Sequence, residues 1–210
     1  MFASAATQRL LLLVLVMLLA GIGIVLLVGR GSGDTQTVRV PQSKFAGPTM
    51  PPGLVAKNFS LTDQHGQRVS LSSYRGHVVI VTFIHSLCQD DCPFMVEQIK
   101  GALNEMPGSG QGIPTVGVSV APDEDTAANR RKFLTVHRMN DRIAFVNGPM
   151  SLMRRIWHSY AVAPGAGAHG HSAVVVLVDK KGVERVGFGG AQITPEELAH
   201  DLRVLQAEPA

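Results

Sequence analysis

The sequence predicts an α/β domain with an N-terminal β-hairpin extension, preceded by a single transmembrane helix. Three observations carry this prediction. One uncharged apolar run lies near the N-terminus, β-branched runs alternate with helix-period segments after residue 56, and turn residues separate these segments. A chain of 210 residues accommodates one such domain together with extensions.

The apolar run at residues 10–28 contains no charged side chain. As a helix it would rise about 28 Å, close to the ~30 Å hydrocarbon core of a bilayer. A cleaved signal peptide is the alternative, but its apolar core usually has only about 7–15 residues. We therefore expect an uncleaved anchor after a short cytoplasmic N-terminus, residues 1–9. Either interpretation carries the rest of the chain across the membrane.

Residues 29–55 are rich in Gly, Pro, Ser and Thr and have no sustained apolar period. We expect them to form a linker that holds a domain, residues 56–205, away from the membrane. The net charge of +3 is too small to indicate a nucleic-acid partner.

The expected elements follow in a fixed order: a hairpin, three strand–helix pairs, two further strands and a closing helix. By residue they are a hairpin over 59–71, strands over 77–85, 114–122, 142–146, 172–179 and 182–188, and helices over 93–106, 123–139, 152–160 and 194–205. This order is a thioredoxin-like arrangement, with the chemistry expected after the first central strand.

Local signals support individual elements. Residues 77–85 are almost continuously apolar and β-branched, which is typical of a strand buried on both faces. Asp123 or Asp125 is a plausible N-cap for the helix that follows them. Thr194 and Glu197 have the spacing of a capping box at the last helix.

Cys88 and Cys92 are the only two cysteines in the chain. Two thiols this close form a structural disulfide, a redox pair or part of a metal site. Closing so small a loop contributes little chain entropy, so a purely structural disulfide is disfavoured. Cys92 precedes Pro93 at the expected start of a helix, where the partial positive charge favours a thiolate.

Two histidines precede the strand expected over 172–179, at a place where a thioredoxin-like oxidoreductase generally has a proline. His169 and His171 would there face the cysteine loop. Two thiolates and one imidazole make a soft, low-coordinate site suited to copper. The pattern G-x-G-x-x-G over 165–170 is not a dinucleotide motif, because a helix precedes it and a strand follows it.

These segments resemble the Sco/SenC family of membrane-anchored copper proteins that help assemble cytochrome c oxidase. The resemblance rests on "CQDDCP", on "HSAVVVLVDKKG" and on the order of the other elements, and covers about residues 56–205 plus the anchor. It implies that Cys88, Cys92 and His171 are the metal ligands. Asp90 matches the acidic position between the cysteines, whereas His85 and His169 have no assigned role.

The resemblance implies a copper-binding metallochaperone that takes Cu(I) and Cu(II) and has no turnover reaction. Its expected partners are the copper-binding subunit of cytochrome c oxidase and other copper donors or thiol-redox proteins. The copper site expected to be assembled is the dinuclear centre of subunit II. The expected location is the cell inner membrane, single-pass, with the domain in the periplasm. The alternative is a membrane-anchored thiol:disulfide oxidoreductase that keeps a copper-accepting partner reduced, with Cys88 and Cys92 as its redox-active pair.

Overall fold

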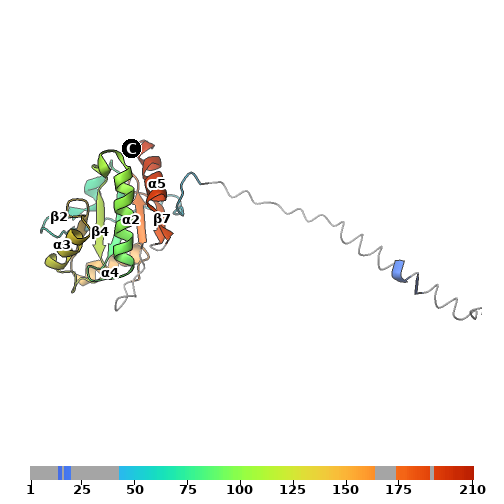
Figure 1. Ribbon diagram of the computed structural model, residues 1–210, viewed down its shortest axis with the longest axis horizontal. Helices are drawn as coiled ribbons and strands as arrows, with labels where there is room; N and C mark the ends of the chain where they lie inside the picture. Colours follow the sequence, from blue (N-terminus) through green and yellow to red (C-terminus); the bar gives the residue numbers. More distant parts are fainter. Residues whose placement is uncertain (1–13, 16, 20–42, 164–173, 190–191) are drawn as a thin grey trace, which may run out of the picture. The chain divides into compact units, whose positions relative to one another are not determined.

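The computed structural model describes residues 14–15, 17–19, 43–163, 174–189 and 192–210 (Figure 1). The chain divides into two units, residues 1–42 and 43–210. In the first unit the described residues are helical. No helix within the described ranges is long and apolar enough to cross a membrane. Most of the span expected over 10–28 lies outside these ranges, so the transmembrane helix stays a prediction.

A five-stranded sheet forms the centre of the second unit, in the order β5-β4-β3-β6-β7. Strands β3, β4 and β5 run parallel, whereas β6 is antiparallel to β3 and β7 is antiparallel to β6. The five strands are β3 (Val79–Ile84), β4 (Thr115–Ser119), β5 (Ala144–Val146), β6 (Val174–Val178) and β7 (Glu184–Gly189). This mixed sheet confirms the predicted α/β class.

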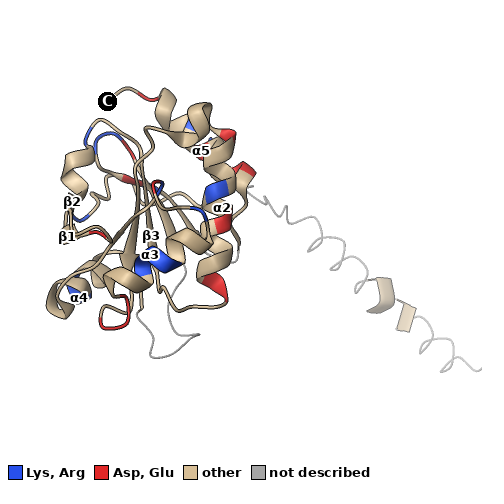
Figure 2. Ribbon diagram, turned by 60° about the vertical axis from the view of Figure 1, so that its left-hand side comes forward, with Lys and Arg blue, Asp and Glu red and all other residues tan. Residues whose placement is uncertain are grey.

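Helices cover both faces of the sheet (Figures 1 and 2). They are α2 (Asp91–Glu105), α3 (Ala127–Val136), α4 (Met150–Ser159) and α5 (Pro195–Ala207), with short 3-10 turns at Leu71–Tyr74 and Pro107–Gly110. One core contains buried side chains of α2, α3 and α5, and the other contains those of α4 and of the N-terminal hairpin. All six residues of β3 are buried, as the apolar run predicted.

Alternation along β3 explains why this strand is apolar throughout. Ile80 and Ile84 belong to the core under α2 and α5, whereas Val79, Val81 and Phe83 belong to the core under α4. Successive side chains of a strand point to opposite faces, so a strand covered on both sides needs apolar residues at every position.

The predicted N-terminal hairpin is confirmed as strands β1 (Ser60–Thr62) and β2 (Arg68–Ser70), which pair antiparallel. Asp63 closes the turn, since its Oδ1 atom accepts the backbone N–H groups of His65 and Gln67, each at 2.8 Å. The hairpin packs on the α4 side of the sheet.

Residues 43–56, here called the strap, belong to the compact unit although the sequence predicted a linker over 29–55. The Met50 N–H donates to the Arg185 carbonyl on β7 at 2.9 Å. The Ala46 and Gly47 N–H groups donate to the two carboxylate oxygens of Asp201 at 2.7 and 2.9 Å. The strap thus covers the outer edge of β7, and the ordered unit begins earlier than composition indicated.

Candidate metal centre

Both cysteines lie where β3 passes into α2, at one end of the central sheet. β3 ends at Ile84 and α2 begins at Asp91. The Cys88 N–H donates to the His85 carbonyl at 3.2 Å and closes a tight turn. Cys92 is the second residue of α2 and is completely buried, whereas Cys88 is 6% exposed. Sequence reasoning had placed Cys92 near the start of this helix, as found.

The two cysteines are adjacent and are not joined in a disulfide. The two side chains are near enough for Cys88 to raise the pKa of the Cys92 thiol, and the His85 N–H donates to the Cys92 Sγ at 3.4 Å. Two sulfurs this close can form a disulfide or bind one soft metal ion. The structure therefore brings together two of the three predicted ligands.

Burial raises the pKa of the Cys92 thiol well above its ordinary value. The hydrogen bond from His85 lowers this pKa, while Cys88 and the charge of Asp125 raise it further. The helix N-terminus had led us to expect a thiolate, but the loss of hydration outweighs that effect. Cys92 is consequently a neutral thiol at pH 7, and a metal ion must displace its proton.

Two polar residues, His85 and Asp90, lie close to the cysteines in the sequence. The His85 Nε2 atom lies 2.8 Å from Glu124 Oε2, so this imidazole pairs with a carboxylate of the loop before α3. Asp90 is exposed and occupies the N-cap position of α2.

Asp125 does not have the N-cap role predicted for Asp123 or Asp125. Thr126 is the N-cap of α3, and its hydroxyl accepts the Asn129 N–H at 3.2 Å. Asp125 is instead completely buried, and its carboxylate accepts hydrogen bonds from Ser86 in the cysteine loop. Asp and Thr are both common N-cap residues, so the sequence alone does not distinguish Asp125 from its neighbour Thr126.

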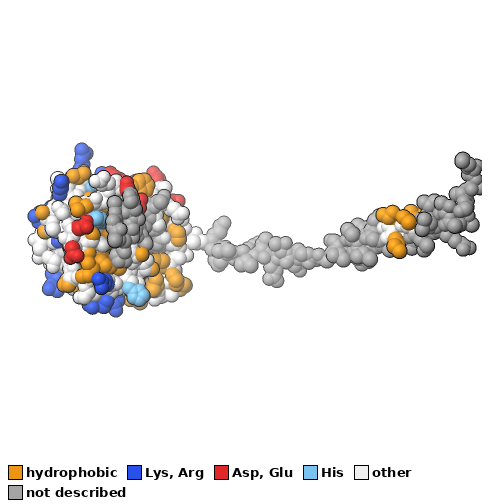
Figure 3. Space-filling model, turned by 90° about the horizontal axis from the view of Figure 1, so that it is seen from below, with side chains coloured by type: hydrophobic (Ala, Val, Ile, Leu, Met, Phe, Trp, Pro, Cys, Tyr) orange, Lys and Arg blue, Asp and Glu red, His pale blue; other side chains and the backbone are white. Residues whose placement is uncertain are grey.

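His169 and His171 lie outside the described residues, so the third predicted ligand stays a prediction. The described residue nearest to them is Val174, the first of β6. Because β6 runs antiparallel to β3, its first residue lies at the end of the sheet where β3 stops. No group of three or more His, Cys, Asp or Glu side chains suited to a metal ion occurs among the described residues. Figure 3 views this end of the domain.

A cavity of about 280 Å³ opens beside Cys88, between the cysteine loop and α3. It is lined by residues 86–89 of the loop and, on α3 and just after it, by Asn129, Lys132, Phe133, Val136 and His137. Cys92 does not line it. Of the two cysteines, Cys88 is therefore the one that borders this opening, although both side chains are buried.

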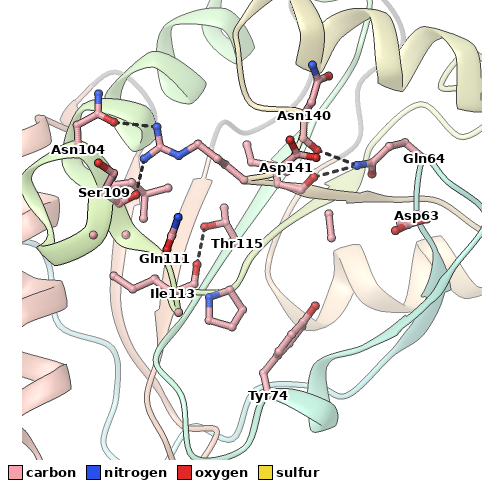
Figure 4. Close-up of a pocket in the computed structure, with 18 of the residues that line it drawn as sticks. Asp63, Gln64, Tyr74, Asn104, Ser109, Gln111, Ile113, Thr115, Asn140 and Asp141 are labelled. Atoms are coloured by element: carbon pink, nitrogen blue, oxygen red, sulfur yellow. Dashed lines mark hydrogen bonds between the residues drawn. The ribbon is translucent and has the colours of Figure 1, made fainter.

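A second cavity, of about 760 Å³, lies at the opposite end of the sheet (Figure 4). Several of the polar residues that line it form hydrogen bonds within the lining. The Gln64 amide donates to the carbonyl of Ile143 at 3.2 Å, and Arg142 donates to Asn104 Oδ1 at 2.8 Å and to the Ser109 carbonyl at 3.0 Å. These bonds give Gln64, Asn104 and Arg142 structural roles.

A mixed sheet flanked by helices, with two adjacent thiols where a central strand meets a helix, defines a thioredoxin-like dithiol protein. Within this class the chain belongs to the SCO1/SenC family, whose model matches residues 48–206. The resemblance inferred from the cysteine and histidine segments is thereby confirmed.

Two relatives are about one quarter identical to this chain in sequence. The chain is 24% identical over 157 residues to the mitochondrial SCO2 homolog of Bos taurus, covering 70% of this chain and 58% of that protein. It is 26% identical over 91 residues to the SCO1 homolog of Bacillus subtilis (strain 168), covering 43% and 47%. The chain thus spans about half the length of these relatives.

Solved structures of Sco proteins share the fold of this chain at low sequence identity. ScoI of Bradyrhizobium japonicum, determined with copper bound, is 26% identical with a TM-score of 0.61, covering 72% of this chain and 99% of that one. BsSco, in which a disulfide switch has been identified, is 20% identical with a TM-score of 0.66, covering 76% and 97%. The second likeness shows the fold alone.

Proposed function

We propose that this protein is a copper-binding metallochaperone that assists copper-site assembly of cytochrome c oxidase, at the dinuclear centre of subunit II. The observation that carries the proposal is the pair of adjacent thiols of Cys88 and Cys92 on a turn fixed by hydrogen bonds. The copper-bound state of the Bradyrhizobium relative supports it.

The chemistry of these donors fits copper as a cargo. Soft thiolates favour Cu(I), and an added imidazole suits Cu(II). His171 is the proposed third ligand, three residues before β6 in the sequence. Because metal binding requires thiolates, uptake releases protons, and the raised pKa of Cys92 selects for an ion that binds sulfur strongly.

The anchor and the location belong to the same proposal. We infer that residues 10–28 span the cell inner membrane and that the domain lies in the periplasm, where it meets the oxidase subunit and other copper donors or thiol-redox proteins. The uncharged apolar run supports this inference.

A second candidate function is thiol:disulfide exchange with a copper-accepting partner. Cys88 lines a surface cavity and would attack a partner disulfide, forming a mixed disulfide and releasing one partner thiol. Cys92, buried behind it, would then attack Cys88, so that the chain ends as a disulfide and the partner as a dithiol. Cys88 borders the cavity and Cys92 does not, and this difference favours the order.

Copper titration of the full-length chain in reduced and oxidised form tests the metallochaperone. The reduced chain should bind a single Cu(I) ion and the disulfide form none, since both ligands are consumed in the bridge. Cys88→Ser and Cys92→Ser serve as matched controls that cannot form the bridge and lack one ligand each. Equal copper uptake by the oxidised and reduced chains would place the site elsewhere and refute the proposal.

A further inference from the structure

Asp125 presents a fully buried carboxylate to the back of the cysteine loop. Its Oδ1 atom accepts two hydrogen bonds from Ser86, one from the backbone N–H at 2.7 Å and one from the hydroxyl at 2.5 Å. Its Oδ2 atom accepts the Ser119 hydroxyl at 2.5 Å. Both oxygens are therefore occupied, and Ser86 supplies two of the three donors.

Bonds to the backbone and to the side chain of Asp125 fix its position. Ser119 is the last residue of β4, and its carbonyl accepts the indole N–H of Trp157 on α4 at 2.9 Å. The Asn147 side chain, just after β5, donates to the Asp125 carbonyl at 3.0 Å. The Asp125 N–H donates to the Ala121 carbonyl at 2.8 Å. The backbone and the carboxylate of Asp125 are thus tied to the ends of β4 and β5, and the carboxylate holds the cysteine loop against them.

Ser86 lies inside the turn that places the two sulfurs. On one side of it, the His85 N–H reaches the Cys92 Sγ at 3.4 Å. On the other side, the Cys88 N–H closes on the His85 carbonyl at 3.2 Å. A displacement of Ser86 would move the His85–Cys88 turn and with it the Cys88 sulfur.

We propose that Asp125 is a positioning residue of the dithiol site, which acts through Ser86 to hold Cys88 beside Cys92. The inference rests on the function proposed for these two cysteines. A carboxylate suits the task because it accepts at both oxygens, and its hydrogen bonds are about twice as strong as those between neutral groups. An amide at residue 125 would keep one acceptor and turn an NH₂ group toward a donor.

The test uses full-length Ser86→Ala and Asp125→Asn chains beside the parent. The matched control is Asp201→Asn, because Asp201 is also completely buried and also accepts two N–H groups, but from the strap. The first measurement is the equilibrium constant for exchange with dithiothreitol. In this reaction the Cys88–Cys92 dithiol reacts with oxidised dithiothreitol to give the protein disulfide and reduced dithiothreitol. The second is Cu(I) affinity, by competition with a chromophoric chelator. Fluorescence of Trp157, the only tryptophan, reports folding.

We expect Ser86→Ala and Asp125→Asn to lower the equilibrium constant for disulfide formation about tenfold, the size of one lost hydrogen bond to a charged group. This corresponds to about 30 mV in potential. Copper affinity should fall by a similar factor. Asp201→Asn should lower stability while both site readouts keep the parental values.

Parental values for a folded Ser86→Ala chain, in which Asp125 keeps its bond to Ser119, would overturn the inference. Site readouts that shift equally in Asp201→Asn would also overturn it, because the effect would then be general destabilisation. If Asp125→Asn does not fold, the Ser86→Ala result decides. A parent chain that binds no copper, while Ser86→Ala still shifts the dithiothreitol equilibrium, would reject the copper proposal and support the positioning role.

Discussion

Replacement of Glu184 by Gln tests how burial acts on a single carboxyl group. Glu184 is the first residue of β7 and is 3% exposed, and its N–H donates to the Leu54 carbonyl of the strap at 2.8 Å. Burial raises the pKa of its carboxyl group from 4.5 to about 7. The nearby Tyr160 shows the same environment, since burial and the Glu184 charge both raise the pKa of its phenol.

The sign of the pH dependence follows from the pKa of Glu184 in the unfolded chain, 4.5, and in the folded chain, about 7. Between 4.5 and about 7 the unfolded chain ionises at this position while the folded chain holds its proton. The free energy of unfolding therefore falls as the pH rises through this window. At about 1.4 kcal/mol for each pKa unit, the upper limit of this loss is about 3 kcal/mol. Glu184→Gln should consequently stabilise the protein by up to that amount at pH 8 and by almost nothing near pH 4.5.

Guanidinium unfolding followed by Trp157 fluorescence, between pH 5 and 8, measures this difference. Glu208→Gln is the control, because its hydrogen bond to Arg185 lowers the pKa of Glu208, and that stabilisation is fully present throughout this range. The control should cost the same free energy at every pH measured. A Glu184→Gln protein whose stability stays parallel to that of the parent from pH 5 to 8 would refute the reasoning.

Two further predictions concern the last helix and the membrane topology. Thr194→Ala should lower the free energy of unfolding by about 1 kcal/mol, because the Thr194 hydroxyl accepts the Glu197 N–H at 3.3 Å. Equal unfolding midpoints for variant and parent would contradict this capping role. A reporter fused after residue 60 should be active only outside the cytoplasm, since residues 10–28 are the proposed span, and activity confined to the cytoplasm would rule that topology out.

Features set by local chemistry could be predicted from the sequence. The apolar run around β3 predicted a strand buried on both faces, and all six residues of β3 are buried. The spacing of Thr194 and Glu197 predicted the start of α5, where the Thr194 side chain caps the helix. The hairpin of β1 and β2 also lies where its turn residues indicated.

Features set by distant contacts could not be predicted. The strap is rich in Gly and Pro like a linker, but its backbone is ordered by Asp201 and by β7, far away in the sequence. Gly47 in particular is required by packing, since a Cβ atom there would lie 2.4 Å from the Phe188 ring. Asp125 lies where an N-cap is expected from the sequence. Its role is instead determined by hydrogen bonds from Ser86 and Ser119.

The proximity of the two cysteines could be predicted from the sequence, whereas the electrostatics around them could not. The pairing of Cys88 and Cys92 followed from their spacing and from the turn before α2. The protonation state of Cys92 did not, because the complete burial of that side chain is a property of the assembled core. The position of Asp125 behind the loop gave no sequence signal beyond an acidic residue after a strand.

The most direct test of the central claim is a copper titration of His171→Ala beside His169→Ala and the parent, with a thiol-exchange assay on the same samples. A copper site needs the imidazole to complete its geometry, whereas exchange needs only the two cysteines. His171→Ala should weaken copper binding and abolish the charge-transfer absorption of thiolate-bound Cu(II), while it still reduces a small disulfide, and His169→Ala should change much less. Parental affinity and spectrum in His171→Ala, together with failed exchange, would contradict the metallochaperone and leave the oxidoreductase in its place.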